Sequence, residues 1–213
     1  RLSFVSLHRV MADGSTAAPP VQPVAEVFAK ASSRATDRKP SKSRPRIPGA
    51  ISPPLEGEVA PLLVLKVGTS SLMSSSSKGQ RVKLANVARL VELIADLKIS
   101  GYQVVLVSSG AVGMGCIKLG LEQKPSNIRI KQAVAAAGQS HLMRMYEDLF
   151  GTVHVQVAQL LLSQSDFTDK VHWSNVKHTI VEALKLNLVP IINENDSTNT
   201  EELRFGDNDN LAA

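Results

Sequence analysis

From Pro61 onward, apolar residues fall into two patterns that alternate along the chain. Short apolar runs predict buried strands, at residues 62–67, 102–108, 155–163 and 188–193. Longer stretches with helical spacing or many alanines predict helices, at residues 82–98, 128–150 and 172–187. The apolar face of the first helix is predicted to consist of Leu84, Val87, Val91, Ile94 and Ala95.

Alternating strands and helices predict βαβ units, which place parallel strands in one sheet with helices on both faces. We therefore expect residues 61–213 to form one α/β domain, a three-layer αβα sandwich with a mostly parallel central sheet. Two stretches of small residues interrupt the pattern. Residues 68–80 are expected to form a Gly/Ser-rich loop, and residues 108–115 a turn between a strand and a helix.

Residues 1–60 differ in composition, with eight of the eleven prolines and nine Lys or Arg against five Asp or Glu. Apolar periodicity is lost there, so we expect a disordered leader. The first ten residues contain Arg and no acid, as mitochondrial transit segments do, but Asp13 and the following prolines fit an amphipathic presequence poorly. Residues from Met11 look like an ordinary cytosolic start, and we expect a cytoplasmic protein.

Charge and composition argue against several classes of function. The net charge of +5 comes mostly from the leader, since residues 61–213 hold fifteen basic against fourteen acidic side chains. Aromatic residues are 4% of the chain and do not interleave with basic ones, which argues against nucleic-acid binding. No apolar run is long enough to span a membrane. The single cysteine, Cys116, cannot form an internal disulfide and is expected to be buried.

The first predicted strand carries a lysine near its end, followed by small residues. The Lys66 ammonium must either reach water or face an anion, because an isolated buried charge is costly. Gly68 and Thr69 follow it, and a glycine with successive N–H groups and hydroxyls can hold phosphate oxygens. A solvated lysine before a flexible turn fits the same residues. The stretch is not a Walker A loop, because the chain contains no GxxxxGK[ST].

The second strand runs into SSGAVGMG at residues 108–115. Ser109, Gly110 and Ala111 have no bulky side chain, so backbone amides there could meet a carboxylate or phosphate at a helix N-terminus. A tight connection that needs glycine only for packing explains the same pattern. The spacing differs from GxGxxG, which weakens a dinucleotide-binding interpretation.

The fourth strand leads into INENDSTNTEELRFGDNDNLAA, which is crowded with short carboxylates and amides. These residues are Asn193, Glu194, Asn195, Asp196, Asp207, Asn208 and Asp209. Such side chains can bind a substrate ammonium, hold Mg²⁺ or orient a lysine. Asn and Asp also favour turns, but a turn-rich hairpin explains less well two such clusters beyond one strand.

Together and in this order, these stretches resemble the glutamate 5-kinases of the amino acid kinase family. The matching motifs are VLKVGTSSL, VLVSSGAVGMG, AAAGQSHLM, QLLLS, INENDS and FGDNDNLAA, within residues 62–213. Single motifs occur loosely in carbamate kinases and aspartokinases, whereas the paired NEND and GDNDN elements are similar to glutamate 5-kinases. We favour the stand-alone kinase over the kinase half of the bifunctional pyrroline-5-carboxylate synthase, whose plant forms usually have a longer loop before DND.

The resemblance implies a role for each motif residue. Lys66 would contact the phosphates of ATP, and Gly68 and Thr69 would shape the phosphate loop. The implied glutamate site contains Ser109, Gly110, Ala111, Asp196 and Asn208. Asp196 would pair with the α-ammonium of glutamate, and Asp207 would orient catalytic lysines rather than act as a base.

The reaction implied by the resemblance moves the γ-phosphoryl group of ATP onto the γ-carboxylate of glutamate, the first step of proline biosynthesis. The acceptor is already a carboxylate, so no general base is needed, and lysines, Mg²⁺ and helix N-termini would offset the repulsion between two anions. The resemblance also implies a homo-oligomer at full length and makes proline a candidate feedback inhibitor. No nucleic acid and no membrane partner is expected.

Two further readings remain open on the sequence. The chain could be a non-catalytic fragment that binds glutamate or proline without turnover. It could also belong to another amino acid kinase, acting on carbamate or aspartate.

The family pattern continues after DND with a segment that frames adenine and a GTGG…K segment with a second catalytic lysine, and neither lies in these 213 residues. We therefore expect the 213-residue chain alone to form little or no glutamyl phosphate. Losing one group aimed at a developing charge costs roughly 2.7–4 kcal/mol of transition-state stabilisation. Glutamate-dependent ADP release by the purified chain measures this, and robust turnover would contradict it.

Overall fold

The computed structural model describes residues 60–76 and 79–198, and a four-stranded sheet runs through this region. Neighbouring strands are parallel, in the order β1-β4-β6-β5. Their bounds are Leu62–Val67 for β1, Gln103–Ser108 for β4, Val157–Leu162 for β5 and Val189–Glu194 for β6. All four strands predicted from the apolar runs are confirmed. The leader, Asp207 and Asn208 lie outside the described residues.

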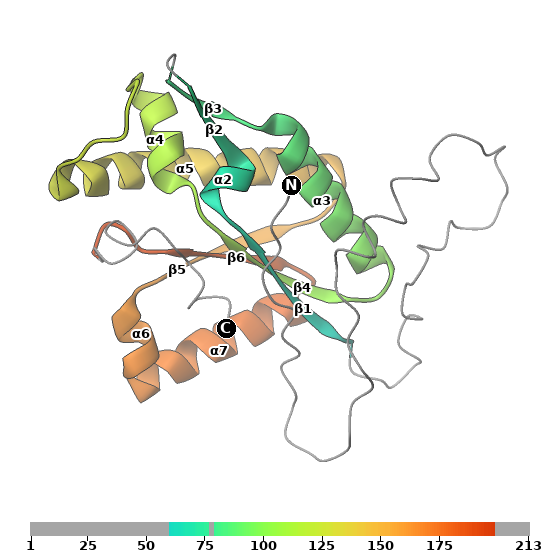
Figure 1. The fold of residues 1–213 in the computed structure, drawn as a ribbon. Helices are drawn as coiled ribbons and strands as arrows, with labels where there is room; N and C mark the ends of the chain where they lie inside the picture. Colours follow the sequence, from blue (N-terminus) through green and yellow to red (C-terminus); the bar gives the residue numbers. More distant parts are fainter. Residues whose placement is uncertain (1–59, 77–78, 199–213) are drawn as a thin grey trace, which may run out of the picture.

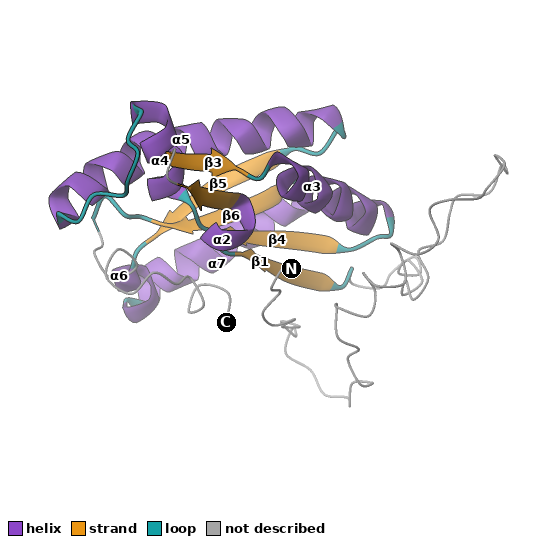
Figure 2. Cartoon of the chain, turned by 45° about the horizontal axis from the view of Figure 1, so that its top comes forward, coloured by secondary structure: helices purple, strands orange, loops and turns teal. Residues whose placement is uncertain are grey.

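Helices cover both faces of the sheet (Figures 1 and 2). One face carries α3 (Leu84–Ile99), α4 (Ala111–Leu119) and α5 (Ile128–Thr152), and the other carries α6 (Gln164–Thr168) and α7 (Lys170–Lys185). This is the expected three-layer αβα arrangement. Within the described ranges, none of the helices has the length and apolar character that crossing a bilayer requires.

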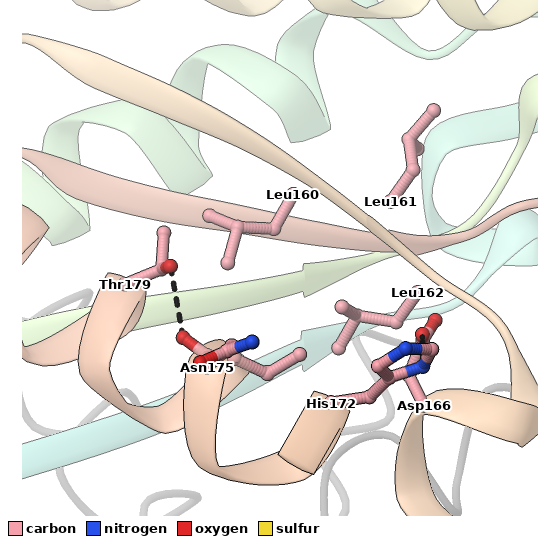
Figure 3. Close-up of a pocket in the computed structure, with 8 residues that line it drawn as sticks. Leu160, Leu161, Leu162, Asp166, His172, Asn175 and Thr179 are labelled. Atoms are coloured by element: carbon pink, nitrogen blue, oxygen red, sulfur yellow. Dashed lines mark hydrogen bonds and ion pairs between the residues drawn. The ribbon is translucent and has the colours of Figure 1, made fainter. Parts of the chain in front are cut away.

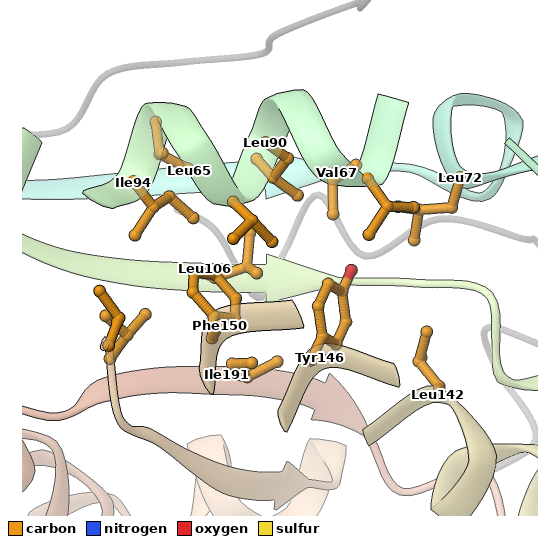
Figure 4. Close-up of a cluster of buried hydrophobic side chains, with 14 of the residues drawn as sticks. Leu65, Val67, Leu72, Leu90, Ile94, Leu106, Leu142, Tyr146, Phe150 and Ile191 are labelled. Carbon is orange, nitrogen blue, oxygen red and sulfur yellow. The ribbon is translucent and has the colours of Figure 1, made fainter. Parts of the chain in front are cut away.

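Side chains alternate between the two faces of each strand and build one apolar cluster on each face. Toward α3 and α5, Leu65, Leu106 and Ile191 of three strands pack with Tyr146 and Phe150 of α5 (Figure 4). The cluster on the α7 side has as its buried members Val105, Val107, Leu160, Leu162 and Ile192. Because both faces are covered, the strands read as nearly continuous apolar runs.

Residues 69–76 and 79–80 form regular structure, so the loop predicted for residues 68–80 is wrong over these described positions. Helix α2 (Thr69–Leu72) leads into an antiparallel hairpin of β2 (Met73–Ser76) and β3 (Gly79–Val82). Leu72 and Met73 are buried and anchor this otherwise polar segment on the core. The Gly/Ser composition did not indicate a hairpin. Within β2, only the first residue, Met73, packs on the core, so serines are tolerated at the more exposed positions that follow.

The first predicted helix is confirmed, but its apolar face contains one error. Leu84, the first residue of α3, is 59% exposed, whereas Leu90 is 2% exposed and packs in the core. Leu90 follows Val87 by three positions and precedes Ile94 by four, which places it on the buried face of the helix.

Helices α4 and α5 approach so closely that two glycines meet backbone. A Cβ added to Gly115 would lie 1.9 Å from the carbonyl oxygen of Val134, and one added to Gly138 would lie 1.9 Å from that of Ala111. Both obstacles are backbone atoms, so no rotamer change can relieve the clash. The turn predicted to extend to residue 115 is therefore wrong beyond Gly110, since residues 111–115 are helical.

We expect Gly138→Ala to destabilise the fold by about 1–3 kcal/mol or more, because overpacking against a fixed backbone costs at least this much. The matched control is Gly151→Ala on the same helix, where an added Cβ has no atom within 4 Å. Because alanine is favoured over glycine inside a helix, this control should stabilise the folded state by roughly 0.5–1 kcal/mol. Urea unfolding followed by circular dichroism measures both. An unchanged unfolding midpoint for Gly138→Ala would contradict the close helix crossing.

Candidate functional site

Three neighbouring strands end at one edge of the sheet, and each end carries residues that the sequence singled out. The carboxyl ends of parallel strands meet at one edge, which is where open α/β sheets bind ligands. Lys66 is on β1, Ser109 follows β4 and Asp196 follows β6, and these strands are adjacent in the order β1-β4-β6. The fold thus brings the three described motifs to the same edge.

The exit of β1 combines a half-buried lysine with an open glycine. Lys66 pairs in register with Val107, so strand alternation places it on the α7 face. Gly68 is extended, with φ of -80°, and an added Cβ there would meet nothing within 4 Å. Neither backbone conformation nor packing requires glycine at this position, and the space above it is open to a ligand. Thr69 follows as the first residue of α2.

The exit of β4 turns sharply into α4. Ser109 is 4% exposed, and its N–H donates to the carbonyl oxygen of Val67 at 3.1 Å, which ties this exit to that of β1. Gly110 has φ of 110°, a left-handed conformation that favours glycine, and Ala111 then begins α4. The first N–H groups of a helix have no partner within the helix, so this loop presents an electropositive helix end.

The exit of β6 buries two carboxyl groups. Asp196 is buried, and its Oδ1 has no hydrogen-bond partner among the described residues. Burial, and then the nearby charge of Glu194, raise the pKa of Asp196 from 3.8 to about 7. Glu194 is buried at the last position of β6. A carboxylate in this position gains from a cation supplied by a ligand, because a buried charge needs a partner.

The edge therefore offers opposite charges on neighbouring loops. The N-terminus of α4 attracts a carboxylate or phosphate, and Asp196 attracts an ammonium group. This combination fits an amino acid. The described residues contain no group of three or more His, Cys, Asp or Glu that could hold a metal ion. At kinase sites Mg²⁺ usually takes phosphates and water as most of its ligands, so a magnesium ion here would not require such a group.

Sequence reasoning singled out Asn193 and the stretch that begins at Ser108, but it missed the contacts that these residues make with α5. The hydroxyls of Ser108 and Tyr146 lie 2.8 Å apart, and the Asn193 amide donates to Oε1 of Gln139 at 2.7 Å. Gln139 belongs to the AAAGQSHLM motif, but nothing in the sequence indicates which strand it contacts. Tyr146 has the spacing of an ordinary core residue, so its polar contact carries no sequence signal.

A second concave feature lies between β5 and α7 (Figure 3). It is an open groove of about 340 Å³ lined by Leu160, Leu161, Leu162, Asp166, His172, Asn175, Val176 and Thr179. Two of its polar side chains contact each other, with 3.5 Å between Nδ1 of His172 and Oδ1 of Asp166, and Asp166 also accepts from the N–H of Ser163. None of the residues predicted for the site lines this groove.

Known proteins resemble this chain over a region that contains the whole four-stranded sheet. The model of the amino acid kinase family matches residues 61–213. The glutamate 5-kinase of Acaryochloris marina is 50% identical over 152 residues, which are 71% of this chain and 40% of that protein. Those of Synechococcus elongatus and Gloeobacter violaceus are each 50% identical over 151 residues, 71% of this chain and 41% and 40% of theirs. The chain thus spans about 40% of the length of these curated relatives.

We expect Asp196→Asn to stabilise the chain at high pH. Folding raises the pKa of Asp196, so the native state loses stability as pH rises from 3.8 through about 7. Asparagine removes this loss, so the gain should be small near pH ~4 and reach a few kcal/mol near pH ~8. The pKa difference corresponds to about 4 kcal/mol at most.

Urea unfolding at these two pH values measures the effect of Asp196→Asn. The control is Asp148→Asn, because Asp148 is exposed on α5. A stability difference that does not change with pH would contradict a buried, ionisable Asp196.

Proposed function

Because the chain belongs to the amino acid kinase family, we propose that its described residues form the glutamate-binding part of a glutamate 5-kinase. Such an enzyme transfers the γ-phosphoryl group of ATP to the γ-carboxylate of L-glutamate. The relatives that share half of the aligned residues support this reading. The chain covers less than half of their length, so the activity of the whole protein is part of the proposal.

One observation carries the proposal: a buried carboxylate with an unsatisfied oxygen lies one strand away from an electropositive helix end. Asp196 supplies a partner for the α-ammonium of an amino acid. Ser109 and the amides of Gly110 and Ala111 supply donors for a carboxylate of the same molecule. Asn208, which lies outside the described residues, is proposed to complete this pocket.

In the proposed reaction, an oxygen of the glutamate γ-carboxylate attacks the γ-phosphorus of ATP. The bond between that phosphorus and the β–γ bridging oxygen breaks, and ADP leaves with the electron pair. Proton transfer is not required, because the nucleophile is an anion and the product is an acyl phosphate. The barrier therefore lies in bringing two anions together and in spreading charge over the transferred group.

Lys66 is proposed to contact the ATP phosphates from the end of β1, with Gly68 and Thr69 shaping the loop around them. Open space above Gly68 supports this, because backbone amides there can be approached closely. Mg²⁺ bound to the ATP phosphates would neutralise part of their charge. Asp207 is proposed to orient the catalytic lysines.

The remaining partners follow from the same proposal. L-glutamate and ATP are the substrates, proline is a candidate feedback inhibitor, and the full-length enzyme is a homo-oligomer in the cytoplasm. Proline biosynthesis is the pathway that glutamyl 5-phosphate would enter.

Calorimetry with the 213-residue chain tests the substrate. We expect binding of L-glutamate and weaker or no binding of L-aspartate, because the two strand ends fix the separation between ammonium and carboxylate. Asp196→Ala should weaken glutamate binding by about 30-fold or more at pH ~8, as expected when one partner of a buried ion pair is removed. Asp148→Ala, an exposed change on α5, should leave the affinity unchanged.

A chimera tests the reaction. Residues 61–213 joined to the remaining part of the Acaryochloris marina relative should form ADP only when glutamate is present. Lys66→Met in that chimera should abolish turnover while glutamate still binds. Turnover with aspartate or carbamate in place of glutamate would assign the chain to another amino acid kinase, and glutamate binding without any turnover would favour the binding-fragment reading.

A further inference from the structure

Two polar contacts, one buried and one part-buried, join α5 to the ends of two adjacent strands. Tyr146 contacts Ser108, the last residue of β4, and Gln139 contacts Asn193, the residue before the last of β6. The register pairs Val107 with Ile192, so Ser108 and Asn193 come next on neighbouring strands. Both contacts lie directly before the loops that hold Ser109 and Asp196.

The contact at β4 is a relay of two hydroxyl groups. The hydroxyl of Ser108 donates to the carbonyl oxygen of Ser109 at 3.2 Å. A serine hydroxyl has one proton, so the Tyr146 hydroxyl, 2.8 Å away, is the donor to Ser108. Tyr146 is fully buried, and burial raises the pKa of its phenol, which keeps that proton in place.

This relay fixes the direction of one peptide group. The carbonyl of Ser109 and the N–H of Gly110 belong to the same planar, trans peptide, so they point in opposite directions. With the carbonyl held toward the buried Ser108 hydroxyl, the Gly110 N–H must point away from it. The N–H of Ser109 is also held, by the carbonyl oxygen of Val67. The backbone that begins α4 is thus fixed on both sides of Ser109.

The contact at β6 fixes a side-chain amide. Gln139 accepts from Nδ2 of Asn193 at 2.7 Å, which leaves Oδ1 of Asn193 to accept the N–H of Glu194 at 3.0 Å. The Glu194 N–H and Oε1 of Gln139 both require the same orientation of the Asn193 amide. Gln139 therefore holds, from α5, the side chain that accepts the N–H of Glu194.

Both anchors lie on one face of α5. Gln139 and Tyr146 are seven residues apart, two helical turns, and the buried Leu142 lies between them. Gly138, next to Gln139, is the glycine that meets the backbone of α4. One rigid helix therefore touches the first turn of α4 and the ends of both strands.

We infer that Tyr146 and Gln139 are positioning residues, through which α5 sets the orientation of the two loops proposed to bind the carboxylate and the ammonium of glutamate. The inference deepens the proposed function and rests on it for the identity of the ligand. The two hydrogen bonds exist without a ligand, so their effect on the loops can be measured separately.

Tyr146→Phe and Gln139→Met test the inference in the 213-residue chain. Each removes one polar contact and keeps the size of the side chain. Phe150→Leu, which is buried on the same helix, and Gln132→Met, two turns before Gln139, are the matched controls. We expect the two test variants to bind glutamate about three- to tenfold more weakly, which is the range given by loss of one hydrogen bond. The control variants should bind glutamate with unchanged affinity.

Amide hydrogen exchange without ligand supplies the local readout. Tyr146→Phe should speed exchange at the Ser109 amide by about tenfold relative to the amides of β1, and Gln139→Met should do so at the Glu194 amide. The control variants should change amide exchange by the same factor at all of these positions, or leave it unchanged. Ser108→Ala should reproduce the effect of Tyr146→Phe, and combining the two should add nothing, because they remove the same relay.

The outcomes separate the two proposals. Suppose that the test variants show faster amide exchange only at Ser109 and Glu194, while the chain binds no glutamate. This result would support the positioning role and overturn the proposed ligand. Glutamate binding with exchange in the test variants equal to that in the controls would overturn the positioning role and leave the proposed function intact.

Discussion

The close crossing of α4 and α5 is the contact on which the rest of the site depends. Backbone meets backbone at Gly115 and Gly138, which no larger residue would permit. This contact brings the first turn of α4 down onto the long helix at the carboxyl edge of the sheet. Because protein interiors are close-packed and deform little, a crossing of this kind fixes α4 as a rigid body. The electropositive helix end then has one position relative to the strands.

The polar groups of the edge are stabilised unequally. The hydroxyls of Ser108 and Tyr146 contact each other in a buried position, where a low dielectric strengthens hydrogen bonds, and Gln139 and Asn193 form a part-buried pair. At the same edge, Oδ1 of Asp196 has no hydrogen-bond partner among the described residues. The supporting contacts are thus satisfied, whereas the loop proposed to face the ligand holds an unsatisfied oxygen. Unsatisfied buried groups in native proteins call for an explanation, and a binding role is the one proposed here.

The sequence predicted the sheet well because buried parallel strands need continuous apolar runs. Such runs can be recognised directly in the amino-acid sequence. It failed at residues 68–80, where two adjacent apolar residues, Leu72 and Met73, decide the structure of a polar segment. The motifs also predicted which strand ends carry polar chemistry. What the sequence could not supply is distance across the fold. That Gln139 meets Asn193, or that Tyr146 meets Ser108, depends on the crossing angle of α5, and no local pattern encodes that angle.

The buried Asp196 links binding of a cationic group at the site to proton release. With a pKa of about 7, its carboxyl is protonated in roughly half of the molecules at neutral pH. A cationic group that settles beside it favours the ionised form, so each binding event drives out about half a proton on average. The observed heat of binding then includes the ionisation heat of the buffer and changes from one buffer to another. In a weakly buffered solution, ligand binding would therefore lower the pH slightly.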